Sequence, residues 1–301
     1  MVDINICVSS DNNYVQHAGV VIASILANAA AEDSLNFFIL DGGISDENKS
    51  KILQLKKLKD CHIEFIAIDA SLFSGYQAIK THGYITLPTY YRLKTASLLP
   101  KLDRIIYMDC DMIATRSLAN LFNTEMDDFP LAGVNDINSR RVRKNPTYIN
   151  AGMTVMNLKK IREMELEDKF QTYAANNAET ITCGDQQIIN EVCKGKIKIL
   201  DERWNVQSSN FVNRSSYTSA PWIIHFVSSK KPWHKNCLSI HKHLYFKHLQ
   251  LTPWALDEDT LQSWTGGSKW ASRWAYMKYR PFFWLRPKFY KSLYWTFVGK
   301  K

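Results

Sequence analysis

The sequence predicts an α/β fold that resembles the doubly wound nucleotide-binding kind. Short apolar segments typical of strands alternate with segments of helical periodicity through most of the chain, which is the pattern of βαβ units. The chain has 301 residues, of which 46% are hydrophobic, so it can bury a sizeable core. The expected unit is therefore one large domain or one and a half, and disorder is excluded as an overall description.

The expected elements follow one another in βα order. Residues 4–8 have the alternation of a first strand, and residues 14–29 have the apolar spacing of a helix. Further strands are predicted at residues 37–40, 63–68, 104–108 and 131–134, and further helices at residues 46–57 and 89–98. In such a fold ligands bind beyond the carboxyl ends of the strands, so the polar residues that follow each strand are the candidates for a site.

The chain lacks both glycine-rich phosphate-binding signatures, GxGxxG and GxxxxGK(S/T). If a nucleotide binds at the strand ends, its phosphates are therefore expected to be held by a metal ion and side chains, since no glycine cradle is available.

Two carboxylates, Asp109 and Asp111, directly follow the apolar strand at 104–108, separated by Cys110. In an extended chain, side chains at i and i+2 emerge on the same side, about 7 Å apart. Such a pair can clamp one Mg²⁺ or Mn²⁺ ion, and these ions commonly bridge the phosphates of a bound nucleotide. The alternative is that the carboxylates cap a helix or stay solvated, because so short a motif also occurs by chance.

A polar run, Asp11 to Tyr14, follows the first predicted strand. One interpretation is structural: an Asp or Asn before a helix is a common N-cap, which contributes about 1 kcal/mol. The other is functional, because Asp11 and Asn13 lie where they could accept hydrogen bonds from a base or a ribose, while Tyr14 offers a stacking face. Both interpretations stay open.

His225 lies at the end of another apolar segment, and Lys231 follows it closely. A histidine in this place is commonly a hydrogen-bonded core residue. The alternative is a metal ligand, which the nearby ammonium favours because the two groups together suit a diphosphate. His234 and His241 are expected on the surface.

The cysteines favour a reducing compartment. Six are scattered singly, without a CxxC pair or the close spacing of a disulfide scaffold. The first residues enter a strand-like alternation without the pattern of a secretory signal, and the longest apolar stretch, at residues 18–31, is too short to cross a bilayer. We expect a cytoplasmic protein.

The net charge of +9 arises in the last residues of the chain. Residues 269–301 contain nine Lys or Arg, no Asp or Glu, and twelve aromatic residues, which leaves 29 basic against 29 acidic residues in the remainder. Cations interleaved with Trp and Tyr suit an anionic membrane interface. The alternatives are a helix that packs its aromatics on the core, and a single-stranded nucleic-acid platform. We expect a catalytic domain at 1–250 and a membrane-associating extension at 251–301, with no nucleic acid as partner.

Six short motifs together carry a resemblance. They are DNNY at 11–14, YRL at 91–93, DCD at 109–111, NAG at 150–152, GDQ at 184–186 and HFVSSKKPW at 225–233. Their order resembles glycosyltransferase family 8 over about residues 3–240. The chain is similar to the bacterial lipopolysaccharide and lipooligosaccharide galactosyl- and glucosyltransferases, and more distantly to the glycogenins. It departs from the family at residues 227–229, where a glycine is common.

The resemblance implies a GT-A fold, which is a single Rossmann-like nucleotide-binding domain with a mixed, mainly parallel sheet, here followed by a short helical C-terminal tail. It also implies a retaining hexosyltransferase. The donor would be a UDP-sugar carrying galactose or glucose, and the acceptor a glycan or lipid-linked oligosaccharide of the lipopolysaccharide type. The enzyme would act as a peripheral protein at the inner face of the cytoplasmic membrane. A non-catalytic sugar-nucleotide-binding protein is the alternative from another class.

The resemblance also assigns roles to residues. Asp109, Asp111 and His225 would bind a divalent metal ion, and the imidazole favours Mn²⁺, with Mg²⁺ as the alternative. Asp185 and Gln186 are the expected catalytic residues. Because an amide is a poor nucleophile, the expected reaction is same-face attack by the acceptor hydroxyl, with the Gln186 carbonyl oxygen stabilising the anomeric carbon. The expected donor-binding residues are Asp11, Asn13, Tyr14, Arg92, Asp109, Cys110, Asn150, Ala151, Asp185 and Lys231.

A basic stretch at residues 135–146 is a candidate for the acceptor side. It contains Arg140, Arg141, Arg143 and Lys144. A loop that receives an anionic glycan and a solvated loop without catalytic role are both consistent with this composition.

Overall fold

The computed structural model describes residues 2–76, 79, 87–137, 139–208, 220–227, 229–235, 237 and 239–265. The basic aromatic tail predicted at 269–301 lies outside these residues. Among the residues that are described, no helix is both long and apolar enough to cross a bilayer.

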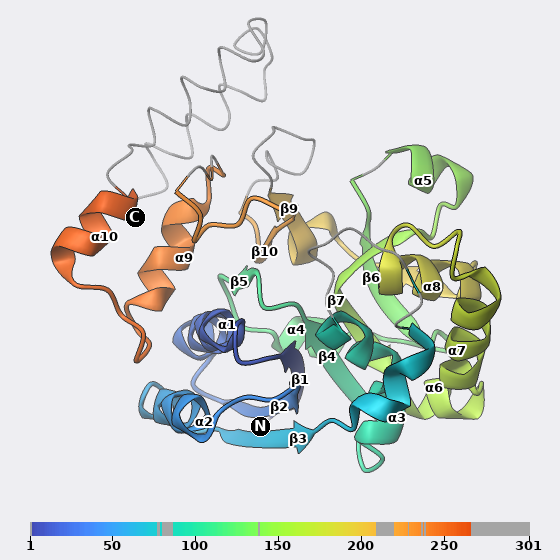
Figure 1. Cartoon of the computed structure of the whole chain (residues 1–301), viewed down its shortest axis with the longest axis horizontal. Coiled ribbons are helices and arrows are strands. Elements are labelled where there is room, and N and C mark those ends of the chain that lie inside the picture. Colours follow the sequence, from blue (N-terminus) through green and yellow to red (C-terminus); the bar gives the residue numbers. More distant parts are fainter. Residues whose placement is uncertain are drawn as a thin grey trace, which may run out of the picture.

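A seven-stranded sheet lies at the centre of the molecule, in the order β3-β2-β1-β4-β7-β6-β8 (Figure 1). Its strands are β1 (Val2–Ser10), β2 (Asp33–Asp41), β3 (His62–Ala67), β4 (Arg104–Met108), β6 (Leu131–Asn135), β7 (Ile149–Asn157) and β8 (Ile197–Ile199). Only β7 runs antiparallel to its neighbours β4 and β6, and the other pairings are parallel. The predicted mixed, mainly parallel sheet is confirmed.

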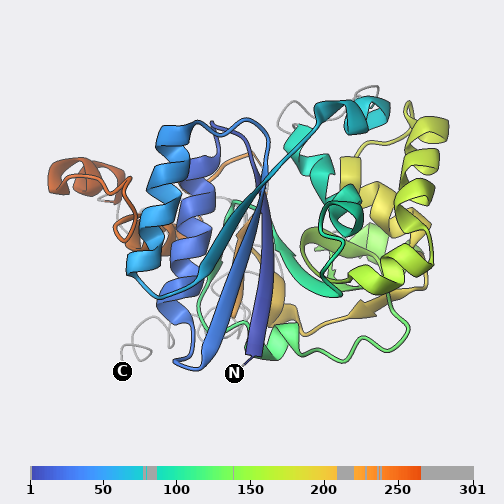
Figure 2. The ribbon, with the colours of Figure 1, turned by 90° about the horizontal axis from the view of Figure 1, so that it is seen from below.

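Helices cover both faces of this sheet (Figure 2). One face carries α1 (Val15–Asn28) and α2 (Asp46–Leu53), which continues as the 3₁₀ turn η1 (Gln54–Lys57). The opposite face carries η3 (Leu87–Lys94), α3 (Thr95–Leu98), α6 (Leu158–Glu163), α7 (Leu166–Asn177) and α8 (Gly184–Val192). The shorter helices elsewhere are η2 (Ala70–Tyr76), α4 (Ala119–Phe122), α5 (Ser139–Lys144) and η4 (Glu202–Asn205).

The helix predicted at 89–98 is confirmed, and most of it is the 3₁₀ helix η3, which continues as α3. Four consecutive side chains in η3 are buried: Tyr90, Tyr91, Arg92 and Leu93. An amphipathic surface helix buries one stripe of its surface, so four buried neighbours in a row do not fit that pattern.

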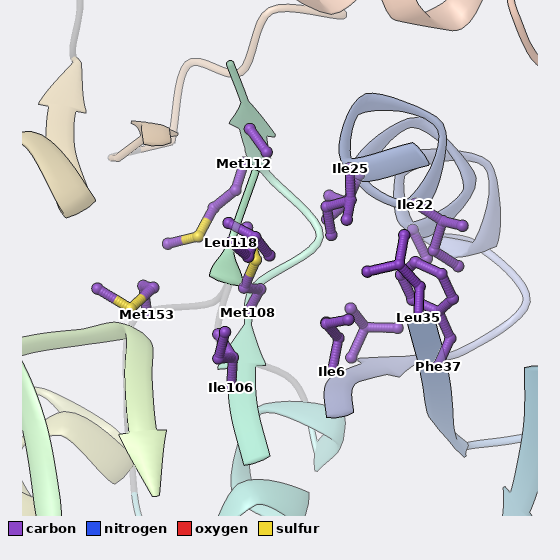
Figure 3. Close-up of a cluster of buried hydrophobic side chains, with 14 of the residues drawn as sticks. Ile6, Ile22, Ile25, Leu35, Phe37, Ile106, Met108, Met112, Leu118 and Met153 are labelled. Atoms are coloured by element: carbon purple, nitrogen blue, oxygen red, sulfur yellow. The ribbon is translucent and has the colours of Figure 1, made fainter. Parts of the chain in front are cut away.

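The alternation along β1 explains why both faces must be covered. Ile4, Ile6 and Val8 belong to the apolar cluster beneath α1, whereas Cys7 belongs to the cluster on the opposite face. Figure 3 shows the first cluster, in which Ile22 of α1 lies against residues of β1 and β2. Both layers of helices are thus held by buried apolar side chains, and the strand ends between them remain available for polar residues.

A second, three-stranded sheet lies beside the first. It contains β5 (Met112–Ala114), β9 (Val206–Ser208) and β10 (Ile223–Phe226), in the order β5-β10-β9. Two further helices, α9 (Lys242–Leu249) and α10 (Glu258–Thr265), follow it. The described part of the predicted extension packs on α9 and α1. The ring of Trp264 lies 6.2 Å from that of Phe246 in α9, and Trp254 lies against Gly19 of α1.

Candidate active site

The pairing of β5 with β10 brings His225 beside the Asp109-Cys110-Asp111 motif. His225 is in register with Met112, and the Asp111 carbonyl accepts the backbone N–H of Phe226 at 2.9 Å. The Asp109 backbone N–H donates to the carbonyl of Gly152 at 2.8 Å, which fixes the start of the motif on β7. Two sheets therefore meet at this point, and one ligand atom each of Asp109, Asp111 and His225 lies within 4.8 Å of the others.

These three groups fit a divalent cation. His225 Nε2 lies 3.2 Å from Asp111 Oδ1 and 3.9 Å from Asp109 Oδ2. Asp111 Oδ1 is buried, yet it accepts no hydrogen bond from the described residues. A buried carboxylate oxygen without a hydrogen bond is costly unless a cation binds it. Two carboxylates and an imidazole are a donor set suited to a divalent transition metal.

Gly152 makes room for this cluster because it has no side chain. A Cβ atom at this position would come 2.8 Å from Asp109 Oδ2 and 2.9 Å from His225 Nδ1. The glycine of the NAG motif is therefore explained by close approach of the β7 backbone to the cluster.

Gly152→Ala is accordingly expected to weaken Mn²⁺ binding about tenfold or more, because ligands displaced by the added methyl group no longer converge. The loss of affinity is measured by titrating the variant with Mn²⁺ and following the electron paramagnetic resonance signal of the free ion. Gly75→Ala is the matched control, since a Cβ there meets no atom within 4 Å. Equal Mn²⁺ affinity in both variants would contradict the packing argument.

Lys231 contacts the same cluster. Its Nζ lies 2.5 Å from Asp111 Oδ2 and donates to the Phe226 carbonyl at 2.8 Å. Burial alone would raise the pKa of Asp111, but the charge of Lys231 and the contact with His225 together hold this pKa below its ordinary value. Asp111 is therefore ionised at neutral pH. Cys110, between the carboxylates, is buried and donates its thiol to the Ser9 carbonyl at 3.0 Å.

Arg92 joins two of the predicted carboxylates. Its guanidinium donates to Asp109, pairs with Asp185 Oδ2 at 2.9 Å, and lies over the Tyr107 ring at 4.3 Å. Burial raises the pKa of Asp185 to about 6, against the opposing charge of Arg92. Burial also raises the pKa of Asp109, again against Arg92. The two acids thus depend on one buried guanidinium for their charged forms.

Gln186 is held on both sides of its amide. Its Oε1 accepts from Asn150 Nδ2 at 3.1 Å and from the Ala151 backbone N–H at 3.3 Å, while its Nε2 donates to Asp136 Oδ2 at 2.7 Å. The backbone N–H can only donate and the carboxylate accepts, so the amide has one orientation. The carbonyl oxygen that we expected to face the sugar is instead directed at β7, because two donors occupy it.

A cleft of about 570 Å³ opens over these residues. Asp11 and Tyr14 line it, and so do Cys110 and Ala151, whereas Asn13 is exposed and outside the lining. Asp11 Oδ1 also accepts the backbone N–H groups of Asn13 and Tyr14, at 3.0 Å each. One carboxylate oxygen of Asp11 therefore caps the start of the helix, as the structural interpretation expects, and the residue still lines the cleft.

The cleft also contains one acidic residue that the sequence did not single out. This residue is Asp136, which follows β6. Arg141 of α5, which belongs to the basic stretch considered for the acceptor side, lies 3.6 Å from Asp136 and also contacts Cys183. Both Asp136 and Arg141 line the cleft. Asp136 has the same signal as Asp109, an acidic residue directly after an apolar strand, and could have been found by it. Asn205, buried beneath His225, has no such signal.

Two histidines differ from their expected surface positions. His234 is half-buried and lines the cleft, where its Nδ1 accepts the Lys231 backbone N–H at 3.2 Å. His241 is also half-buried, and burial lowers its pKa to about 4. Trp233 explains why the chain turns inward here, because its ring stacks on His17 of α1 with 3.5 Å between ring centroids.

The sequence model of "Glycosyl transferase family 8" matches residues 5–237. The chain belongs to this family. It is therefore a glycosyltransferase, and the cleft described above is its candidate active site. A Haemophilus influenzae relative is 30% identical over 254 residues, which cover 80% of this glycosyltransferase and 76% of the relative. The "Lipopolysaccharide 1,2-glucosyltransferase" of Escherichia coli K12 is 24% identical over 84% of this chain and 80% of its own.

Solved structures support the fold of the glycosyltransferase. The galactosyltransferase LgtC, in complex with donor and acceptor sugar analogs, superimposes with a TM-score of 0.73 at 23% sequence identity. The match covers 87% of this chain and all of LgtC. The GT-A fold implied by the sequence motifs is thereby confirmed.

Proposed function

We propose that this glycosyltransferase is a retaining hexosyltransferase that transfers galactose or glucose from a UDP-sugar to a glycan of the lipopolysaccharide or lipooligosaccharide type. The convergence of Asp109, Asp111 and His225 in the cleft is the observation that carries the proposal, because nucleotide-sugar diphosphates need a cation at this point. The E. coli relative, named as a lipopolysaccharide glucosyltransferase, supports the acceptor class.

The cation, proposed as Mn²⁺, would be held by Asp109, Asp111 and His225, and would supply positive charge for the departing nucleoside diphosphate. Lys231 lies beside this position and contributes a second positive charge, of the kind that stabilises a transition state by about 3–4 kcal/mol. Asp11 and Tyr14, which line the cleft, are proposed to hold uracil and ribose.

The sugar is proposed to bind between Arg92 and Gln186. Arg92 and Asp185 offer a donor and an acceptor for sugar hydroxyls, and Asn150 and Ala151 fix the amide of Gln186. The acceptor hydroxyl attacks the anomeric carbon on the face that the leaving phosphate departs from, and its proton passes to the phosphate oxygen. Retention follows because bond breaking and bond formation share one face. Since the Oε1 of Gln186 faces β7, the carboxylate of Asp185 is the group available to stabilise positive charge on the sugar.

The direct test is a screen of UDP-sugars. Purified protein with Mn²⁺ is incubated with UDP-galactose, UDP-glucose, UDP-N-acetylglucosamine or UDP-xylose, with and without rough lipooligosaccharide, and products are read by mass spectrometry. The proposal expects slow hydrolysis of UDP-galactose or UDP-glucose alone, and a mass gain of one hexose on the acceptor. Binding of UDP without a product from any donor would favour the non-catalytic alternative.

The tail is proposed to bring the enzyme to the inner face of the cytoplasmic membrane. Residues 269–301 carry nine basic and no acidic residues, and each cation near an anionic surface contributes about 1 kcal/mol. Deletion of residues 269–301 is expected to abolish co-sedimentation with phosphatidylglycerol vesicles and to leave hydrolysis of the UDP-sugar intact. Retention of vesicle binding in the truncated protein would refute this role, and neutral phosphatidylcholine vesicles provide the control.

A further inference from the structure

Asn205 lies directly behind the proposed cation site without reaching the cleft. It ends η4, its side chain is fully buried, and its Nδ2 donates to Asn150 Oδ1 at 2.9 Å. Its Oδ1 lies 3.2 Å from His225 Nδ1, and Asn150 Oδ1 lies 3.0 Å from the same nitrogen. One imidazole nitrogen is therefore enclosed by two side-chain amides.

The polarity of this contact is fixed by the backbone. The Gly152 N–H, which can only donate, points to Asn150 Oδ1 at 3.2 Å, so that atom is an oxygen. Asn150 Nδ2 in turn donates to Gln186 Oε1. Since the Asn205 amide donates its Nδ2 to Asn150, its oxygen is the atom that faces His225. His225 Nδ1 thus meets two acceptors and must carry the proton.

A proton on Nδ1 leaves the lone pair of the neutral ring on Nε2. That nitrogen faces Asp111 Oδ1 at 3.2 Å and Asp109 Oδ2 at 3.9 Å. Only this tautomer presents a lone pair to a cation held by the carboxylates. The opposite tautomer would direct an N–H at the cation and a lone pair at the amide oxygens.

We infer that Asn205 is a positioning residue of the cation site, which, together with Asn150, keeps the proton on His225 Nδ1 and aims Nε2 at Asp109 and Asp111. The inference rests on the proposed function, since it concerns the cation of that site. Outer partners of metal-binding histidines typically change metal affinity 10- to 100-fold when they are replaced. Asn205→Leu is expected to weaken Mn²⁺ binding by about this factor.

Asn205→Asp is the conservative variant. A carboxylate at this position still accepts the Nδ1–H of His225, which is a common arrangement behind a metal-binding histidine, although it cannot replace the hydrogen bond that Asn205 Nδ2 donates to Asn150 Oδ1. We expect its Mn²⁺ affinity to stay within about tenfold of that of the wild type, and the Nδ1–H tautomer to persist. Asn190→Leu is the matched control, because Asn190 is equally buried and its side chain bonds to the Ile149 backbone and the Gln186 carbonyl and not to His225.

The test uses the full chain with ¹⁵N-labelled histidine. Long-range ¹H–¹⁵N spectra at pH 8 in chelator assign the His225 tautomer, with His225→Gln identifying the signal, and titration with MnCl₂ gives the affinity. The expected result is an Nδ1–H ring in the wild type, in Asn205→Asp and in Asn190→Leu, with weakened Mn²⁺ binding in Asn205→Leu alone.

Two results would overturn the inference: a wild-type ring without a proton on Nδ1, or Asn205→Leu protein that binds Mn²⁺ as tightly as the wild type. The first needs no variant, so it applies even if Asn205→Leu fails to fold. A wild-type Nδ1–H ring without measurable Mn²⁺ affinity would overturn the proposed cation site itself, and the inference with it.

Discussion

Asp111→Asn is expected to reduce Mn²⁺-dependent hydrolysis of the UDP-sugar on the order of 10²- to 10³-fold, because it removes a preorganised charge from the site. The substitution keeps the size of the side chain but removes the charge that pairs with Lys231 and lies beside His225 Nε2. The loss should appear in kcat and in Mn²⁺ affinity together. Initial rates at several Mn²⁺ concentrations, with urea unfolding as a check on stability, measure both.

Asp128→Asn is the control for this variant. Asp128 is 98% exposed and pairs only with Lys160 at 3.2 Å, so its loss should leave hydrolysis unchanged. Hydrolysis that is undiminished in Asp111→Asn would refute the assignment of Asp111 as a metal ligand, whatever the behaviour of the control.

The parallel half of the fold could be predicted from the sequence because β1 to β4 and β6 are apolar segments separated by turn or helix signals. The strand β7 could not be predicted, although it contains the NAG motif at residues 150–152. Eight of its nine residues are buried, so the strand has no alternation between apolar and polar faces. β5 and β9 have three residues each and are too short for a periodicity argument.

The site was predictable where a polar group directly follows a strand. Asp109 and Asp111 follow β4, and His225 lies near the end of β10. Their positions at the ends of apolar strands were therefore enough to make them candidates for the site. Their meeting could not be derived, because it depends on the β5–β10 pairing between distant segments. The role of Asn205 could not be predicted from the sequence. It depends on two hydrogen bonds inside the fold, and the residues next to Asn205 in the sequence give no sign of them.

Replacement of Arg92 is expected to have the largest effect on stability. The guanidinium is 3% exposed and is the shared partner of Asp109 and Asp185. Arg92→Met leaves both carboxylates without it, and breaking a buried ion pair in this way typically costs about 3–5 kcal/mol. Urea unfolding at pH 7.5 in chelator measures the loss. Lys51→Met is the control, because its partner Glu47 is 78% exposed and water screens the attraction between the two charges.

The pH dependence of the stability of Arg92→Met distinguishes the effect of the unpaired carboxylates from the effect of lost packing. Burial raises the pKa of Asp185 to about 6 in the folded protein, above the ordinary value of 3.8, so the folded state binds more protons than the unfolded state between these values. Stability contributed by this group therefore falls as pH rises through that window. Without Arg92 the pKa of both acids rises further, so the deficit of Arg92→Met should be largest above pH 7 and smallest near pH 4.

Adding Asp185→Asn to Arg92→Met removes one of the two unpaired charges. The double variant is expected to recover part of the stability at pH 7.5, with an interaction of about 0.5–3 kcal/mol between the two positions. It should recover little at pH 4, where the carboxyl group of the single variant is already protonated. A deficit in Arg92→Met that is constant from pH 4 to pH 8 would show that lost packing on Tyr107, and not the stranded carboxylates, accounts for the effect.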